Sequence, residues 1–208
     1  MTLDEALLES SVVAIIRGVK PAEAVAIGEA LYAGGVRAVE VPLNSPDPFT
    51  SIASLAKAFD GRMAIGAGTV LSPDKVVGVH QAGGRFIITP NTRPDVIRRA
   101  IELGMDPAPG FATATEAFEA IDAGARHVKL FPAGTYGSGH VRALKAVLPA
   151  HVQVWAVGGV KPDDFLEWWA AGCRGFGLGS ELYKVGQSPE DTFEKAKVAV
   201  AAAAALPR

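Results

Sequence analysis

The sequence predicts an α/β protein built as a single (β/α)8 (TIM) barrel. About eight short β-branched runs alternate with helical stretches along the 208 residues, joined by loops of small residues. Prolines open several of these helices, and glycines close most of them. No segment has the composition of a linker, so we expect residues 1–208 to form one domain. An open doubly wound sheet is the alternative, but it does not require such even spacing.

The predicted elements follow in a regular order. The expected strands are the apolar runs 12–16, 36–41, 63–67, 85–88, 105–107, 127–131, 152–157 and 175–178. The expected helices between them open with a first-turn proline at Pro21, Pro73, Pro94 and Pro162. The fifth strand is the weakest, because it contains Asp106 and Pro107 and is followed by Pro109. Residues 198–205 are rich in alanine and predict a final helix.

Composition excludes several classes of function. A formal charge of -2 and a pI near 6.1 indicate no nucleic-acid surface, and no apolar run is long enough to span a bilayer. The amino-terminal residues are acidic and amphipathic, unlike a secretory signal. The lone Cys173 cannot form an internal disulfide. We therefore expect a cytoplasmic protein with no membrane or nucleic-acid partner.

Lys129 stands out because it lies within the strand-like run 127–131, whereas the other lysines lie in helical or loop-like stretches among polar neighbours. A buried, unpaired ammonium tends to lose its proton, and a neutral lysine is a nucleophile toward ketones. Two structural interpretations stay open: the amine reaches the rim of the barrel, or it pairs with a carboxylate.

Strand alternation predicts which side chains share the interior. Val128 and Leu130 suit the helix-facing side, so Lys129 points inward near the end of its strand. The same alternation turns Ile15 and Arg17, Glu40, and Ala67 and Thr69 inward. We therefore expect four polar side chains from four strands to meet at the carboxyl end of the barrel, where such folds build their sites: Arg17, Glu40, Thr69 and Lys129.

Two glycine loops predict a phosphate site. The seventh strand runs into Val157-Gly158-Gly159, and the eighth into Gly177-Leu178-Gly179-Ser180. Glycine lets backbone N–H groups approach an anion, and loops after these two strands hold phosphate in many barrels. Tight turns are the alternative explanation for each pair.

The predicted cavity suits Schiff-base chemistry on a phosphorylated keto acid. The histidines do not cluster with Glu40, so we expect no metal. No Gly-x-Gly-x-x-Gly motif is present, so we expect no nicotinamide or flavin and no cofactor. An amine nucleophile, a carboxylate, a guanidinium and a phosphate cradle remain.

The motifs resemble those of the KDPG/KHG aldolase family, in order from about residue 12 to residue 183. They are Glu40-Val-Pro-Leu-Asn-Ser-Pro46, Ile65-Gly-Ala-Gly-Thr-Val-Leu71, Thr89-Pro-Asn91, Pro109-Gly110, Val128-Lys-Leu-Phe-Pro132, Val157-Gly-Gly159 and Gly177-Leu-Gly-Ser180. The resemblance implies a metal-free, homotrimeric barrel that cleaves a 2-keto-3-deoxy-6-phospho sugar acid to pyruvate and glyceraldehyde 3-phosphate.

The resemblance also implies a role for each matching position. Lys129 forms the Schiff base, and Glu40 moves protons. Arg17 and Thr69 contact the pyruvate part of the substrate. The residues that match the phosphate-binding loops are Gly158, Gly159, Gly179 and Ser180.

Two departures favour the galactonate-specific branch of the family. Gluconate-type members often carry Arg-Thr where this chain has Asn44 and Ser45, and a threonine where it has Val157. Val157 cannot hydrogen-bond a substrate hydroxyl, and such polar matching discriminates strongly between substrates. The first alternative is that the chain is a gluconate-type or dual-specificity enzyme in which these positions have changed by neutral drift.

Two further alternatives belong to other classes. A non-catalytic barrel would bind a sugar phosphate without turnover, and an isomerase would not trap pyruvate. The role of Arg93, near the end of the fourth strand, stays open between a helix start, an interface and a substrate contact.

Overall fold

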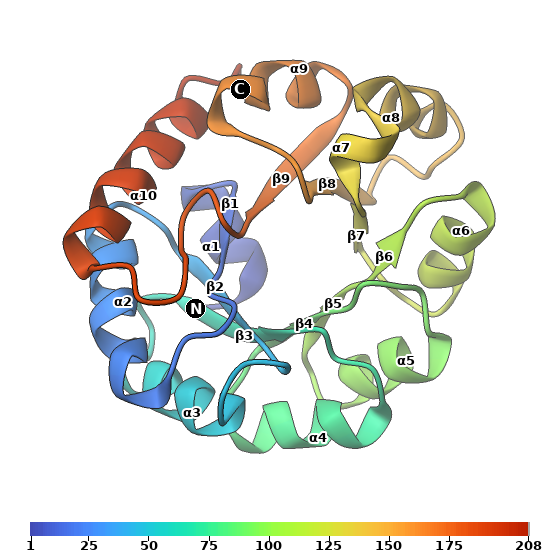
Figure 1. Cartoon of the computed structure of the whole chain (residues 1–208). Coiled ribbons are helices and arrows are strands. Elements are labelled where there is room, and N and C mark those ends of the chain that lie inside the picture. Colours follow the sequence, from blue (N-terminus) through green and yellow to red (C-terminus); the bar gives the residue numbers. More distant parts are fainter. Residues whose placement is uncertain (208) are drawn as a thin grey trace.

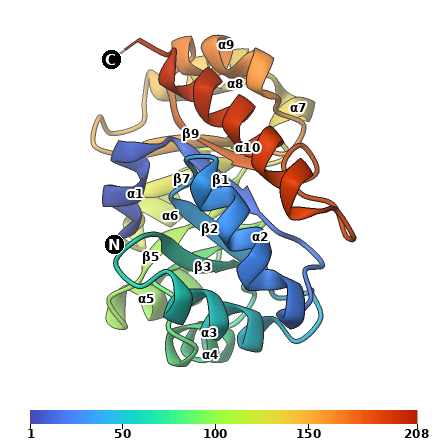
Figure 2. The same cartoon turned by 90° about the vertical axis from the view of Figure 1, so that its left-hand side faces the viewer.

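The computed structural model describes residues 1–207 and has the predicted barrel architecture. Arg208, the last residue of the predicted domain, lies outside the described residues. Nine parallel strands form one sheet in the order β5-β4-β3-β2-β1-β9-β8-β7-β6, and the helices surround it (Figures 1 and 2). The strands are β1 (Val12–Ile15), β2 (Ala38–Pro42), β3 (Ala64–Gly68), β4 (Phe86–Ile88), β5 (Asp106–Ala108), β6 (Gly110–Phe111), β7 (His127–Leu130), β8 (Gln153–Val157) and β9 (Cys173–Leu178).

The helices alternate with the strands along the chain. They are α1 (Leu3–Glu9), α2 (Pro21–Ala33), α3 (Pro48–Ala58), α4 (Pro73–Gln81), α5 (Pro94–Glu102), α6 (Ala114–Asp122), α7 (Ala133–Tyr136), α8 (Ser138–Lys145), α9 (Phe165–Ala170) and α10 (Pro189–Ala204). Proline opens α2, α4 and α5 as predicted, because the first helical position needs no N–H donor. Pro162 instead begins a short 3-10 turn, η1 (Pro162–Asp164), which leads into α9. The final helix is longer than predicted and begins at Pro189.

The weak fifth strand is where the barrel closes. β5 pairs with β4, β6 pairs with β7, and Pro109 interrupts the single barrel strand that β5 and β6 form together. Proline has no N–H to donate, but its carbonyl accepts a hydrogen bond from the Lys129 N–H at 2.9 Å. The break therefore falls at a residue that cannot donate to the ladder, and the ring of eight strand positions is complete.

Side chains from alternate strand positions form two separate apolar clusters. Val39, Val41, Val128 and Leu130 lie in the layer between the sheet and the helices, as predicted. Ala67 also lies in this outer layer, so the prediction that it faces the interior is wrong. Ala67 is in register with Val41, whose side chain points outward, whereas Ala64 lies in the interior cluster on the other face of β3.

The interior is filled by large side chains set against glycines. Trp155 and Phe86 are fully buried there. A Cβ at Gly175 would lie 2.7 Å from the Trp155 ring, and one at Gly66 would lie 2.6 Å from the Phe86 ring. Each ring therefore occupies the space that a neighbouring side chain would need. Packed aromatic side chains therefore fill this part of the barrel interior.

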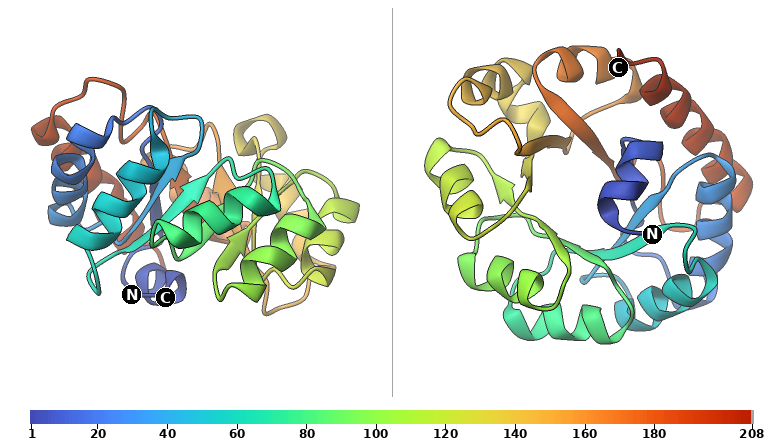
Figure 3. Two further views of the ribbon diagram at one scale, coloured as in Figure 1. Left: turned by 90° about the horizontal axis from the view of Figure 1, so that it is seen from below. Right: turned by 180° about the vertical axis from the view of Figure 1, so that it is seen from behind.

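Helix α1 covers the amino-terminal mouth of the barrel. Seen from behind, α1 lies across the opening of the strand ring (Figure 3). Leu3 is fully buried and packs in the interior cluster with Ala6, whereas Leu8 is 88% exposed. Thr2 caps the helix by accepting from the Glu5 N–H at 3.2 Å. The amphipathic start noted in the sequence is therefore a plug that completes the core.

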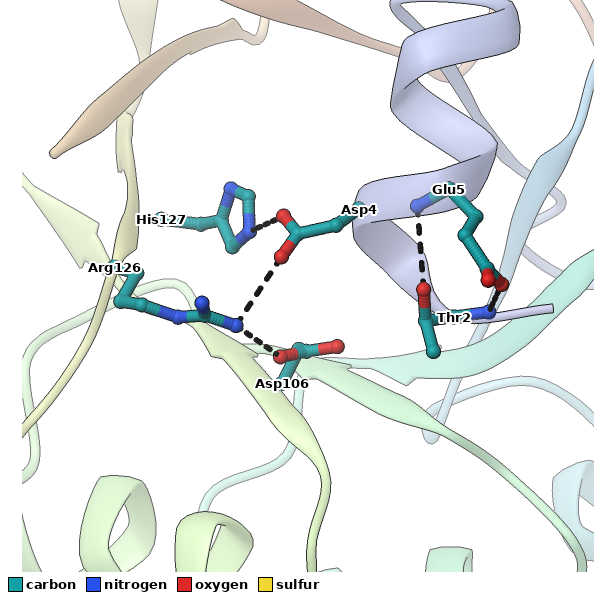
Figure 4. Close-up of polar contacts among 6 residues, drawn as sticks. All are labelled: Thr2, Asp4, Glu5, Asp106, Arg126 and His127. Carbon is teal, nitrogen blue, oxygen red and sulfur yellow. Dashed lines mark hydrogen bonds and ion pairs between the residues drawn. The ribbon is translucent and has the colours of Figure 1, made fainter. Parts of the chain in front are cut away.

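Polar contacts attach the plug to the barrel (Figure 4). Asp4 Oδ1 lies 2.9 Å from His127 Nε2, and Arg126 Nη2 lies 3.2 Å from Asp4 Oδ2 and 3.3 Å from Asp106 Oδ1. Burial lowers the pKa of His127, so the neutral ring is the form that the fold favours. His127 lies at the entry end of its strand, as predicted, and belongs to the structural end of the barrel.

None of the helices in the described part of the chain is both long and apolar enough to cross a bilayer.

Replacing Leu3 by Ala should reduce the free energy of unfolding by about 2–5 kcal/mol, because the buried side chain leaves a cavity that the rigid barrel cannot close. Urea denaturation followed by circular dichroism measures this loss. The matched control is Leu8→Ala, on the exposed face of the same helix, which should stay within about 0.5 kcal/mol of the parent. Equal losses of unfolding free energy in the two variants would contradict the role of α1 as a plug.

Candidate active site

Glu40 projects into the barrel from the middle of β2. Its strand neighbours in register are Ile15 on β1 and Gly66 on β3. The residue is 2% exposed, and its Oε2 atom has no hydrogen-bond partner among residues 1–207. A Cβ at Gly68 would lie 1.4 Å from this oxygen, so only glycine leaves room for the carboxylate. Sequence reasoning missed Gly68, although the Gly-Ala-Gly alternation in β3 was a signal of a close approach.

Lys129 reaches the same interior from β7. It is 6% exposed, and its register neighbours are Gly110 on β6 and Trp155 on β8. Its Nζ lies 4.7 Å from the centroid of the Phe131 ring, a cation–π distance. Lys129 therefore points inward, as its strand position predicts. The contact with Phe131 was not foreseen from the motif.

Burial shifts the pKa values of these two groups in opposite directions. Burial raises the pKa of Glu40 to about 7, although the positive charges of Lys129 and Arg17 oppose that rise. Burial also lowers the pKa of Lys129 to about 8, against the opposing effect of the Glu40 charge and with a smaller contribution from Arg17. No hydrogen bond or ion pair joins the two side chains directly. Near neutral pH the site can therefore offer an uncharged amine and a carboxyl group that exchanges its proton readily.

Arg17 lies just beyond the end of β1, on an exposed loop. Its Nη1 donates a hydrogen bond to Asn44 Oδ1, on the loop that follows β2. The Arg17 charge influences the pKa of both Glu40 and Lys129, so the guanidinium belongs to the same electrostatic site. Three of the four predicted polar side chains are thus brought together.

Thr69 follows β3 with a left-handed backbone, φ 57°, so strand alternation does not extend to it. Its predicted orientation therefore rested on a rule that does not apply there. The half-buried residue lies directly after Gly68, whose Cα faces the Glu40 carboxylate. This position keeps Thr69 beside the site.

The two glycine loops follow the neighbouring strands β8 and β9. Gly158 and Gly159 have φ values of 88° and 77°, a region that side chains other than glycine rarely adopt. The Gly134 N–H donates to the Gly158 carbonyl at 2.8 Å, which ties this loop to the start of α7. Gly179 and the exposed Ser180 follow β9.

Val157 is 4% exposed and lies in the interior cluster at the end of β8, as its parity predicts. A Cβ at Gly177 would lie 2.8 Å from a Val157 methyl group. This apolar side chain therefore borders the interior directly before the glycine loop.

Two hollows lie elsewhere. A space of about 640 Å³ beside Thr2 and one of about 730 Å³ beside α1 lie at the amino ends of the strands, and neither is lined by Lys129 or Glu40. We identify the site from its buried ionisable groups, because hollows around a structural plug carry no comparable chemistry. Within residues 1–207, no group of three or more His, Cys, Asp or Glu side chains is placed to hold a metal ion.

Arg93 is engaged at a helix start. It occupies the N-cap position of α5, pairs with Asp95 and donates to the Leu71 carbonyl at 3.2 Å. These contacts support the structural interpretation of Arg93.

Comparisons with known proteins identify relatives over nearly the whole chain. The family model described as KDPG and KHG aldolase matches residues 3–197. The chain is 48% identical over 190 residues to the 2-dehydro-3-deoxy-6-phosphogalactonate aldolase of Escherichia coli (strain K12), covering 91% of this chain and 93% of the relative. It is 34% identical over 172 residues to the KHG/KDPG aldolase of the same organism, covering 81% and 79%. The solved "Native KDPGal structure" matches with a TM-score of 0.90 and 48% identity, covering 92% of this chain and 93% of that one.

Replacing Glu40 by Gln should lower the pKa of Lys129 below its value of about 8, because the carboxylate charge that favours the ammonium is lost. The fraction of neutral amine at pH 7 then rises. Amidination by methyl acetimidate at a series of pH values, with mass spectrometry of the Lys129 peptide, measures the midpoint. The peptide that contains the exposed Lys57 should show the same pH dependence of amidination in the parent and in Glu40→Gln. An unchanged or higher midpoint for Lys129 would contradict the coupling.

Proposed function

Since the chain belongs to the KDPG and KHG aldolase family, we propose that it cleaves 2-dehydro-3-deoxy-6-phosphogalactonate to pyruvate and glyceraldehyde 3-phosphate through a Schiff base on Lys129. The chain is an aldolase, a carbon–carbon lyase. One observation carries the choice of residues: the amine of Lys129 and the carboxylate of Glu40 are buried in one interior, with pKa values shifted toward neutrality.

The reaction begins when the neutral Lys129 amine attacks the C2 ketone. Loss of water from the carbinolamine gives an iminium ion, which serves as the electron sink. Glu40 removes the C4 hydroxyl proton through a water molecule, and the C3–C4 electron pair moves into the iminium. Glyceraldehyde 3-phosphate leaves, and a pyruvate enamine stays on the lysine. Glu40 then returns the proton to C3, and hydrolysis of the iminium releases pyruvate.

The other predicted residues bind the substrate. Arg17 offers a guanidinium to the carboxylate of the keto acid, and Thr69 lies beside it at the end of β3. The glycine loops after β8 and β9 offer backbone N–H groups to the phosphate, with Gly158, Gly159, Gly179 and Ser180 as its binding residues. The positive φ values at Gly158 and Gly159 support this role, because they let the backbone turn toward an anion.

The galactonate epimer is favoured on two grounds. The relative with 48% identity carries the galactonate name, whereas the KHG/KDPG relative is 34% identical. Val157 adds a physical reason, because it presents methyl groups where a threonine would offer a hydroxyl. A gluconate-type or dual specificity is the second candidate.

The homotrimer in this proposal rests on the resemblance alone. From composition and the placement of the histidines we expect a metal-independent enzyme in which the single barrel domain of residues 1–208 carries the whole site, located in the cytoplasm. A non-catalytic sugar-phosphate-binding barrel is the distant alternative, and the buried Lys129 amine argues against it.

Incubation with pyruvate and sodium borohydride should attach a reduced pyruvate adduct to Lys129, detected by peptide mass spectrometry. Lys129→Met should give no adduct and no cleavage, since the apolar side chain fills the site without an amine. Glu40→Gln should still form the adduct but lose about 10²–10⁴-fold in kcat, because only proton transfer is removed. An adduct on another lysine, or none on the parent, would contradict the assignment.

Pyruvate release should be fast with the galactonate epimer and slow with the gluconate epimer, with a chelator present. Val157→Thr should shift the ratio of kcat/KM for the two epimers toward gluconate by about 3–10-fold, the effect of one added hydrogen bond. Val157→Ala, which shortens the side chain without adding a hydroxyl, should leave that ratio unchanged. If Val157→Thr also left it unchanged, our explanation of specificity would fail while the aldolase assignment stood.

A further inference from the structure

The loop after β2 holds the loop after β1 by two adjacent contacts. Arg17 Nη1 donates to Asn44 Oδ1, and the Gly18 N–H donates to Ser45 Oγ at 2.9 Å. Ser45 is buried, whereas Asn44 and Arg17 are exposed. One contact therefore holds the side chain of Arg17, and the other holds the backbone beside it.

The loop that makes these contacts is itself anchored. The Leu43 N–H donates to the Gly68 carbonyl at 2.8 Å, and the Ser45 N–H donates to the Pro42 carbonyl at 2.9 Å. The first bond joins the loop to the residue whose Cα lies against the Glu40 carboxylate. Asn44 and Ser45 thus connect Arg17 to the same backbone that positions Glu40.

The chemistry of the amide suits this role. A guanidinium only donates hydrogen bonds, so Asn44 must present its carbonyl oxygen to Arg17. The bond uses one donor and leaves the other N–H groups of Arg17 for an anion. A neutral amide also orients the guanidinium without cancelling its charge, whereas a carboxylate at this position would compete with the anion for Arg17.

We propose that Asn44 and Ser45 are positioning residues that clamp Arg17, so that its free N–H groups bind an anionic group of the substrate. This inference rests on the proposed function, since it assigns Arg17 to a substrate anion. It assigns Asn44 a role that acts through Arg17 and not through a contact with the C4 hydroxyl of the substrate. The choice between epimers then depends on Val157.

A double-mutant cycle tests the clamp. Asn44→Ala should raise KM about 3–10-fold and leave kcat within about twofold. The reason is that Arg17 loses the charge-assisted hydrogen bond that orients it toward the substrate anion. Arg17→Ala should raise KM further, and adding Asn44→Ala to it should have no additional effect. Gln81→Ala is the matched control, because Gln81 carries the same amide group but is exposed at the end of α4, at the amino end of the barrel and away from Arg17. It should behave like the parent.

A second readout does not require turnover. Arg17→Ala should move the pH midpoint of Lys129 amidination upward, because the positive charge of Arg17 lowers the pKa of Lys129. Asn44→Ala adds no charge of its own, so it should move the midpoint upward only by releasing Arg17, and it should cause no further shift when Arg17 is already alanine. The midpoint of urea unfolding should be unchanged in all variants, because the side chains of Arg17 and Asn44 are exposed.

The outcomes separate this inference from the proposed function. Additive effects of Arg17→Ala and Asn44→Ala on KM would overturn the clamp, as would a changed epimer ratio in Asn44→Ala. If the parent released no pyruvate from either epimer, the proposed function would fail. The amidination midpoints would then decide the clamp alone: an upward shift that depends on Arg17 supports it, and no shift overturns it.

Discussion

The desolvation of Lys129 and Glu40 is the constraint on which the rest of the site depends. A lone buried charge costs several kcal/mol, so each group moves its pKa toward neutrality, and the Coulombic attraction between them offsets only part of the burial. This effect requires surroundings of low polarity, to which the buried rings of Trp155 and Phe86 contribute. The same burial that makes these charges unfavourable for stability suits the roles proposed for them, the amine as a nucleophile and the carboxylate as a proton carrier.

Glycines make room for these groups inside the barrel. Gly66 and Gly175 admit the rings of Phe86 and Trp155, and Gly68 admits the Glu40 carboxylate. A closed barrel of this size has a packed interior, so a polar group enters it only where a neighbouring position gives up its side chain. The arrangement of small residues on β3 is therefore a condition of the chemistry as well as of the packing.

The two ends of the barrel have different roles. At the amino end, α1 closes the mouth with Leu3, and the contacts among Asp4, His127 and Arg126 attach it to the strands. At the carboxyl end, exposed loops carry Arg17 and the glycine turns, and hydrogen bonds between neighbouring loops hold them. The strands carry the two groups proposed to react, and the loops carry the residues proposed to bind the substrate.

The sequence by itself determined the order of strands and helices, the breaks at proline, and the inward direction of Lys129 and Glu40. These features follow from local periodicity and backbone chemistry. The inward direction predicted for Ala67 was wrong because that residue is in register with the outward-pointing Val41, and alternation does not extend to Thr69 because that residue has a left-handed backbone. Only the tertiary structure decided the clearance at Gly68, the Arg17–Asn44 contact and the plug formed by α1. Each of these is a contact between segments distant in sequence, and no local pattern records the distance between two strands or two loops.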